Sequence, residues 1–332
     1  MEQKAARGNA FTNNPLVKAV GTQKIVIILV ILALFTFFGA KSPQFRQYST
    51  IVSILDYSYY ISFMAIGVTF VLITGGVDLS IGTGMIACAL LGGNFVIYQG
   101  WPVAMGMVVC ILLGLAFGCF NGLTVAVLDL PPFIATLGSM MIARGLGSIM
   151  IGGVSVPWPA VGMPKGWFRS IFKINNSNVL IPMGFLLVIL IALLMTVLLS
   201  KSRPGRYIFA IGSNKEAARL SGIQVVKWQA LAYLICGVFT GLAGIAYAAT
   251  FQTVVPGIGA GLELDAIAAA IIGGTSMNGG VGTVSGTLLG VFVLALLKTG
   301  LPFMGLQANW QQIATGIVLL AAVFIDVWRN AR

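Results

Sequence analysis

Residues 179–200 read VLIPMGFLLVILIALLMTVLLS, a run without one charged side chain. About 20 apolar residues are what an α-helix needs to cross the hydrocarbon core of a membrane. The rest of the 332-residue chain has a similar composition, because 58% of its residues are hydrophobic and only 8% are charged. Soluble domains carry about 25% charged residues. The composition therefore excludes a soluble globular protein.

Apolar runs of this kind recur along the chain and predict an all-α polytopic membrane protein with about ten transmembrane helices. The expected spans are residues 25–40, 58–74, 79–98, 102–127, 132–151, 179–200, 229–250, 263–277, 282–301 and 308–327. We expect one transmembrane domain over residues 25–328, preceded by a cytoplasmic segment (1–24) and followed by a cytoplasmic tail (329–332). A soluble domain is not expected, because no loop is long enough to form one.

The charges suggest an orientation. The chain has 19 Lys and Arg residues against 8 Asp and Glu residues, a net charge of +11. Lys and Arg concentrate on the cytoplasmic side of membrane proteins, and with both termini inside, 12 of the 19 basic residues fall on inner segments. The largest inner loop is 201–228. The basic residues expected on the outer side or at its edge are Lys41, Arg46, Lys165, Arg169, Lys173 and Lys298. The long outer loop, 152–178, carries Trp158, Trp167 and Phe168, which we expect at the membrane interface.

Several chemistries are excluded. The chain has no histidine, which removes Ser-His-Asp catalysis and the usual zinc sites. Its four cysteines stand apart in apolar stretches, so neither a disulfide framework nor a metal site is expected. No GxxxxGK[ST] phosphate-binding loop occurs, so this chain does not hydrolyse a nucleotide by that route. An intramembrane enzyme would have to use Asp78, Arg144, Glu263 and Asp265, which show no convergent spacing.

Two glycine-rich stretches interrupt the apolar pattern. Residues 75–82 read GGVDLSIG, and residues 257–265 read GIGAGLELD. Interrupted hydrophobic segments at comparable places in two halves point to an internal repeat around a transport path. Some helices should therefore be broken, and five spans in each half would make the repeat an inverted one.

The inner loop contains a short amphiphilic helix. Ser213 and Glu216 have the spacing of a capping box, and Gly222 can close the helix in a left-handed conformation. A helix of about two turns is not stable alone in water and needs a partner surface. The segment is either a solvated basic connector or a projecting helix that docks into a groove of another protein. The candidate docking residues are Arg206, Ser213, Asn214, Lys215, Glu216, Ala217, Ala218, Arg219, Leu220 and Gly222.

Polar residues within or beside the spans are candidates for a translocation path. Charged groups at membrane depth are costly and usually functional or paired, although carboxylates such as Asp78 can also cap helix N-termini. Neutral polar residues in spans more often pack helices together. The path candidates are Asp78, Ser80, Asn94, Asn121, Phe133, Thr136, Glu263, Asp265, Thr275 and Ser276. Arg144, deep in the fifth span, should face the bundle interior or snorkel outward, with a carbonyl or carboxylate partner.

Four stretches resemble motifs of one known family. They are residues 76–82 (GVDLSIG), 132–138 (PFIATLG), 205–223 (GRYIFAIGSNKEAARLSGI) and 263–283 (ELDAIAAAIIGGTSMNGGVGT). In this order they are similar to the motifs of ABC-transporter permease subunits that import ribose, galactose, xylose and related monosaccharides. The likeness covers almost the whole chain from about residue 25. Ser213 departs from the glycine that the family often has there.

The resemblance implies a transport function without catalysis on this chain. The helix over 213–222 would be the coupling helix on a cytoplasmic ABC ATPase, which would bind ATP and Mg, so no cofactor is expected here. A periplasmic or extracellular sugar-binding protein and a second permease, usually an identical copy, would complete a bacterial inner-membrane importer working by alternating access. Nucleic acid is not an expected partner. Permeases for branched-chain amino acids or nucleosides, and a stand-alone carrier or channel, remain alternatives.

Overall fold

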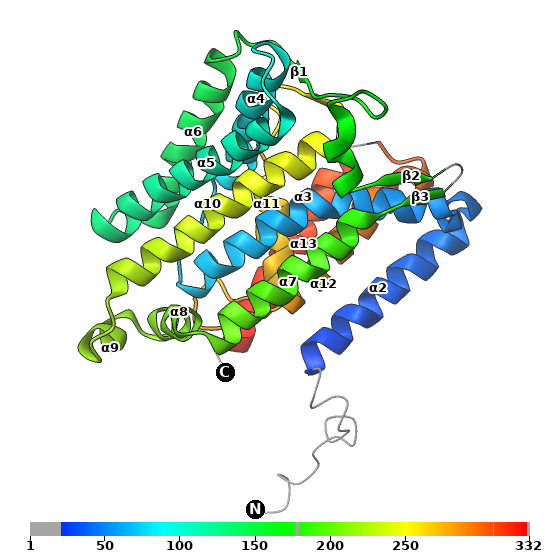
Figure 1. Ribbon diagram of the computed structural model, residues 1–332. Coiled ribbons are helices and arrows are strands. Elements are labelled where there is room, and N and C mark those ends of the chain that lie inside the picture. The colour runs from blue at the N-terminus through cyan, green and yellow to red at the C-terminus, as the bar shows by residue number, and fades with distance from the viewer. Residues whose placement is uncertain (1–20, 177–178, 308, 331–332) are drawn as a thin grey trace, which may run out of the picture.

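The computed structural model describes residues 21–176, 179–307 and 309–330, and their architecture is helical (Figure 1). Short strands are the only sheet elements there, namely β1 (Val156–Pro157), β2 (Ile174–Asn176), β3 (Val179–Ile181) and β4 (Thr253–Val254). The apolar helices are α2 (Thr22–Lys41), α3 (Tyr48–Ile73), α4 (Ile81–Ile97), α5 (Val103–Gly122), α6 (Pro132–Ile149), α7 (Met183–Lys201), α10 (Val225–Thr250), α11 (Leu262–Ile272), α12 (Val284–Gly300) and α13 (Asn309–Asn330).

Each predicted span coincides with one of these helices, which confirms the all-α polytopic fold. Among the described residues, seven helices are long and apolar enough to cross a membrane. Helices α4, α11 and α13 fall outside that set. The prediction for span 263–277 was too long, because α11 ends at Ile272. Gly273 follows it and Gly274 has a φ of +95°, a left-handed conformation that a helix cannot continue through.

Helices α3 and α10, each of 26 residues, cross the middle of the bundle and are buried along most of their length. Helix α10 also packs closely on α5. A Cβ atom at Gly237 would lie 2.3 Å from the Gly114 carbonyl oxygen and 2.6 Å from the Gly118 Cα atom. Glycines four residues apart allow this close approach of two backbones, as at other helix crossings in membranes.

The helix order fits the expected inverted repeat of five helices. Helices α2 to α6 form one half, and α7 with α10 to α13 form the other. In each half the third helix follows an interrupted segment, and the fifth packs on it, since α6 contacts α4 and α13 contacts α11. The matching helices α3 and α10 have the same length and run in opposite directions (Figure 1).

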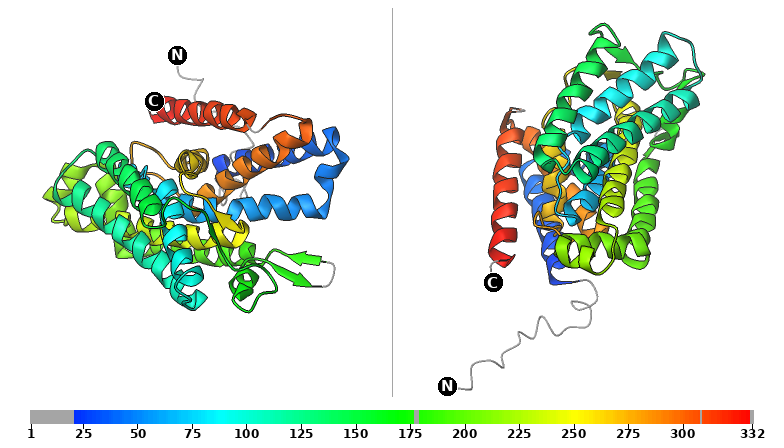
Figure 2. Two further views of the ribbon diagram at one scale, coloured as in Figure 1. Left: turned by 90° about the horizontal axis from the view of Figure 1, so that it is seen from above. Right: turned by 90° about the vertical axis from the view of Figure 1, so that its left-hand side faces the viewer.

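The two ends of the bundle differ. The start of α2, the end of α13 and the short helices α8 (Arg203–Ser213) and α9 (Lys215–Leu220) lie at one end, here called the α9 end (Figures 1 and 2). The four short strands and the 3₁₀ turn η3 (Gly166–Ile171) lie at the opposite end. Of the expected cytoplasmic segments 1–24 and 329–332, residues 1–20 and 331–332 lie outside the described residues. Further single turns are η1 (Pro43–Arg46), the π turn η2 (Leu123–Val127) that extends α5, and η4 (Leu301–Met304).

The described part of the loop 152–178, residues 152–176, is more deeply packed than its sequence suggested. Trp158 is 2% exposed and its indole Nε1 donates a hydrogen bond to the Ala89 carbonyl oxygen at 2.9 Å. Phe168 is fully buried, so of these aromatics only Trp167 has the exposure expected of a membrane-interface residue. Residues 156 and 157 pair with β4, which joins this segment to the chain after α10.

Candidate functional site

The projecting end of α8 and α9 is the first candidate site. Asn214, not Ser213, is the N-cap of α9, because its side-chain oxygen accepts a hydrogen bond from the Ala217 N–H at 2.9 Å. Ser213 is the last residue of α8, and its hydroxyl donates to the Phe209 carbonyl oxygen at 2.9 Å. The predicted capping box of Ser213 with Glu216 is therefore wrong. An Asn cap suits the extended conformation between two helices as well as Ser does.

The C-terminus of α9 is as predicted. Gly222 has a φ of +80°. The Ile223 N–H donates to the Ala218 carbonyl oxygen at 3.1 Å, and the Gly222 N–H donates to that of Arg219 at 3.0 Å. These bonds satisfy carbonyl groups that the last turn would otherwise leave without a partner.

One face of α9 is anchored and the other is open. Ala218 is buried in a small cluster with Ile211 and Val225. Leu220 is 87% exposed, more than any other large hydrophobic side chain in the described residues. An exposed leucine on a short, anchored helix outside the apolar spans is suited to burial in another protein, because burying such a side chain contributes about 1.5–3 kcal/mol.

Basic side chains surround this exposed leucine. Lys215 lies 3.3 Å from Asp129, and Arg219 lies 4.0 Å from Glu216. All four side chains are exposed by half or more, so these pairs contribute little to stability. Arg206 on α8 is also exposed and donates to the Lys201 carbonyl oxygen. The surface of α8 and α9 is therefore basic, and Leu220 is its most exposed large apolar side chain.

Inside the bundle, three path candidates from the first half form one cluster. The Asp78 carboxylate accepts hydrogen bonds from the Ser80 hydroxyl at 2.6 Å and the Ser80 N–H at 2.9 Å. The Asn121 amide donates to both Asp78 oxygens at 3.2 Å and to the Ser80 hydroxyl at 2.8 Å. Each of the three residues is at most 3% exposed. This cluster holds the chain just before α4, but Asp78 does not cap the helix itself, because the N-cap residue is Ser80 and α4 has no side-chain cap hydrogen bond.

The starts of α4 and α11 meet within the bundle. A Cβ atom at Gly82 would lie 2.3 Å from Glu263 Oε2 and 2.9 Å from the Glu263 backbone nitrogen, so only glycine fits at position 82. Glu263 Oε1 accepts the Gly261 N–H at 2.9 Å. Within the described residues, its buried Oε2 has no hydrogen-bond partner. The two interrupted segments thus bring both helix N-termini and one unsatisfied carboxylate oxygen to the same place.

Asp265, two residues further on, is paired. Its carboxylate forms an ion pair with Lys298 of α12 and accepts a hydrogen bond from the Tyr57 hydroxyl at 3.4 Å. The two charged side chains are 2% and 14% exposed. Charge sorting expected Lys298 on the outer side or at its edge. The structure adds that its side chain is largely buried in the last turn of α12, as the counter-ion of Asp265. Neither Lys298 nor Tyr57 could be linked to Asp265 from spacing.

The loop after α11 is tied to α13. The Ser276 hydroxyl donates to Asp326 at 2.9 Å, and the Met277 N–H donates to the same oxygen at 3.3 Å. Thr275 is fully buried. Sequence reasoning missed Asp326, although a carboxylate in the last apolar span was a signal for it.

The remaining candidates lie apart from these clusters. Asn94 is half-buried near the far end of α4, and Phe133 is 57% exposed at the start of α6. Thr136 is buried and donates to the Pro132 carbonyl oxygen at 2.8 Å. Arg144 is exposed on α6, beside Gly257 and Ile258. No partner of Arg144 is seen among the described residues of this single chain, so the expected carbonyl or carboxylate partner stays a prediction.

A bundle of apolar helices, two of which begin at interruptions that meet inside it, defines a multi-pass membrane protein. The chain belongs to the family described as "Branched-chain amino acid transport system / permease component", which matches residues 50–323.

Its relatives include several sugar permeases. It is 33% identical to the ribose import permease protein of Escherichia coli K12, over 90% of this chain and 92% of the relative. It is 35% identical to the ribose import permease protein of Bacillus subtilis 168, over 93% and 94%. It is 34% identical to the galactose/methyl galactoside import permease protein of Escherichia coli K12, over 92% and 94%. No solved structure matches. The resemblance to monosaccharide-import permeases expected from the motifs is confirmed.

Proposed function

We propose that this chain is the transmembrane permease subunit of a binding-protein-dependent ABC importer. It would carry a monosaccharide across the bacterial cytoplasmic membrane by alternating access, with energy from a partner ATPase. The relatives named as import permeases for ribose and galactose support the solute class. The chain would catalyse no reaction, and ATP and Mg would be bound by the partner.

The exposed Leu220 carries the proposal that another protein docks at the α9 end. Helices α8 and α9 form the coupling element, Leu220 enters a pocket of the ATPase, and Arg206, Lys215 and Arg219 contact its rim. Anchoring by Ala218 lets a movement of the ATPase reach α10 without the helix unwinding. With this role the α9 end, which holds the start of α2 and the end of α13, would face the cytoplasm.

The solute path would lie at the interface of two permease copies, two identical chains being the simpler arrangement. Arg144 supports an aqueous or protein-covered surface on α6, because a guanidinium facing lipid is disfavoured by a few kcal/mol. Helices α4 and α11 meet at Gly82 in the centre of each copy. This supports the starts of these two helices as the part that would move between the outward-open and inward-open states. The sugar-binding protein would dock at the end that holds the short strands.

A branched-chain amino acid is the second candidate solute, because the description of the matching family names that class. Proteoliposomes holding the chain with its ATPase and binding protein distinguish the two. We expect ATP-dependent uptake of radiolabelled ribose or galactose and none of leucine. Uptake of leucine with no sugar uptake would overturn the monosaccharide assignment.

The docking role is tested at position 220. Replacing Leu220 by Asp should weaken co-purification of the ATPase by about 10- to 100-fold, from the loss of roughly 1.5–3 kcal/mol of apolar burial. Leu220→Met, which keeps the apolar volume, should retain the ATPase and serves as the matched control. Full retention of the ATPase by the Asp variant would refute the docking surface.

A further inference from the structure

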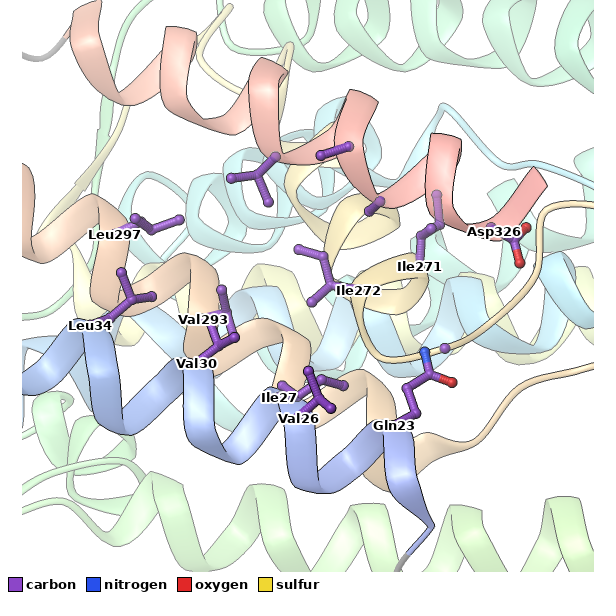
Figure 3. A pocket seen from close by; sticks show the side chains of 14 residues that line it. Gln23, Val26, Ile27, Val30, Leu34, Ile271, Ile272, Val293, Leu297 and Asp326 are labelled. Carbon is purple, nitrogen blue, oxygen red and sulfur yellow. The ribbon is translucent and has the colours of Figure 1, made fainter. Parts of the chain in front are cut away.

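An apolar groove runs between α2 and α13 on the side of the bundle (Figure 3). Helix α2 packs mainly on α12, and α13 packs mainly on α11, so a space of about 380 Å³ is left between them. Aliphatic side chains line it from all four helices, including Val30 of α2, Ile272 of α11, Val293 of α12 and Ala322 of α13. Its volume is in the range of ligand sites, about 300–1,000 Å³.

The groove is polar at one end only. Gln23 and Asp326 lie at the α9 end of the groove, and Leu34 and Leu297 lie at the other (Figure 3). Gln23 lies beside Gly274, since a Cβ atom at position 274 would fall 2.5 Å from the Gln23 amide. Asp326 already accepts the two hydrogen bonds from Ser276 and Met277. The groove is therefore amphipathic along its length.

A second cavity, of about 450 Å³, adjoins the polar end and shares Gln23 and Gly274 with the groove. Gln23, Lys24 and Thr283 provide its side-chain polar groups. The Lys24 ammonium donates one hydrogen bond to the Ser285 hydroxyl at 2.7 Å, and two of its three donors remain. In the described part of the chain, no carboxylate lies within ion-pair distance of Lys24. This cavity thus carries an uncompensated positive charge.

The length of the groove matches one membrane leaflet. Gln23 and Leu34 lie 11 residues apart on α2, a rise of about 16 Å. Half of a hydrocarbon core of about 30 Å is about 15 Å. An acyl chain in the groove would thus end near the bilayer midplane while its headgroup lay beside Lys24. The Lys24 ammonium favours an anionic headgroup in the adjoining cavity, whose described lining residues include no carboxylate. The Asp326 carboxylate belongs to the polar end of the groove itself, where it already accepts two hydrogen bonds.

We propose that the groove between α2 and α13 binds one acyl chain of an anionic phospholipid from the leaflet at the α9 end, with Lys24 holding the phosphate. The bound lipid would fill the space between α13 and α2. Lipid binding here is independent of which solute the protein carries.

Native mass spectrometry of the purified protein with added phosphatidylglycerol or phosphatidylcholine tests this site. Wild type should retain one phosphatidylglycerol per chain and favour it over phosphatidylcholine. Lys24→Gln should lower that preference about fivefold, since a basic residue near an anionic headgroup contributes about 1 kcal/mol. Lys201→Gln, at the exposed end of α7, is the matched control and should leave the preference unchanged. An unchanged preference in Lys24→Gln would overturn the headgroup assignment.

Filling the groove tests the acyl chain. Ala322→Trp and Val30→Trp, from opposite walls, should each abolish retention of both lipids. Leu190→Trp, on an exposed face of α7, should retain them. Size-exclusion chromatography identifies any variant that fails to fold. If only one of the two groove variants folds, that variant alone is enough to test the proposal. Lipid retention equal to wild type in a folded groove variant would overturn the proposal. A wild-type dimer in which the second copy covers the groove and no lipid is retained would overturn it too.

Discussion

Replacing Lys298 by Met should destabilise the protein more than any other single loss of charge in the bundle. The ammonium of Lys298 is the counter-ion of Asp265, whose side chain is only 2% exposed. Met keeps the length and volume of the lysine stem but leaves the carboxylate without a cation. Removing one partner of a buried ion pair costs about 3–5 kcal/mol. The Tyr57 hydrogen bond, at 3.4 Å, is too long to compensate for the missing charge.

The free energy of unfolding in mixed detergent micelles, titrated with SDS, measures this cost. The double variant Lys298→Met with Asp265→Asn removes both charges, and we expect it to recover more than half of the loss, because replacing both partners of a buried pair is often nearly neutral. Lys165→Met is the control, since that ammonium is exposed and contacts only carbonyl oxygens. A loss below about 1 kcal/mol in Lys298→Met would refute a buried ionic pair.

Three further variants test packing and the path. Gly237→Leu should lower the free energy of unfolding by about 3 kcal/mol or more, because the side chain forces α10 away from α5. The control Gly138→Leu, at an open position on α6, should express normally. Equal yields of the two variants in a fluorescence size-exclusion assay would contradict the close crossing. Trp158→Phe should cost about 0.5–1.5 kcal/mol of unfolding free energy by removing the buried hydrogen bond from the indole to the Ala89 carbonyl oxygen, and the exposed Trp167→Phe should change it little. Arg144→Leu should insert normally in membranes yet lower sugar uptake by about tenfold or more, and undiminished uptake would remove Arg144 from the path.

The elements that sequence predicts well are those fixed by the membrane. Ten apolar runs mark the helices, because a segment that crosses the lipid needs apolar side chains. The glycine-containing stretches 75–82 and 257–261 mark the interruptions, because the helices do not continue through them. Helix α8 was missed because Arg203-Pro204-Gly205 looks like a helix breaker. Proline is tolerated in the first turn, however, and the Ser202 side chain accepts the Gly205 N–H at 3.3 Å as an N-cap.

Long-range partners could not be predicted from one sequence. The Asp265 pair with Lys298 and the Asp326 contact with Ser276 join residues far apart in the chain, and only the packing of α11 against α12 and α13 brings them together. Charge counting assigned Lys298 by its position along the chain, which ignores a carboxylate on a neighbouring helix. Whether Ser213 or Asn214 caps α9 depends on where the preceding helix ends. That helix, α8, was not predicted, and it extends through Ser213.

Sugar accumulation in proteoliposomes is the most direct test of the central claim, that a partner ATPase drives this permease through α9. Vesicles would hold the chain and its ATPase, with the binding protein added on the side of the short strands. We expect accumulation of radiolabelled ribose or galactose against its gradient only with ATP on the α9 side, and none with Leu220→Asp. Accumulation without ATP or without the ATPase would contradict the claim.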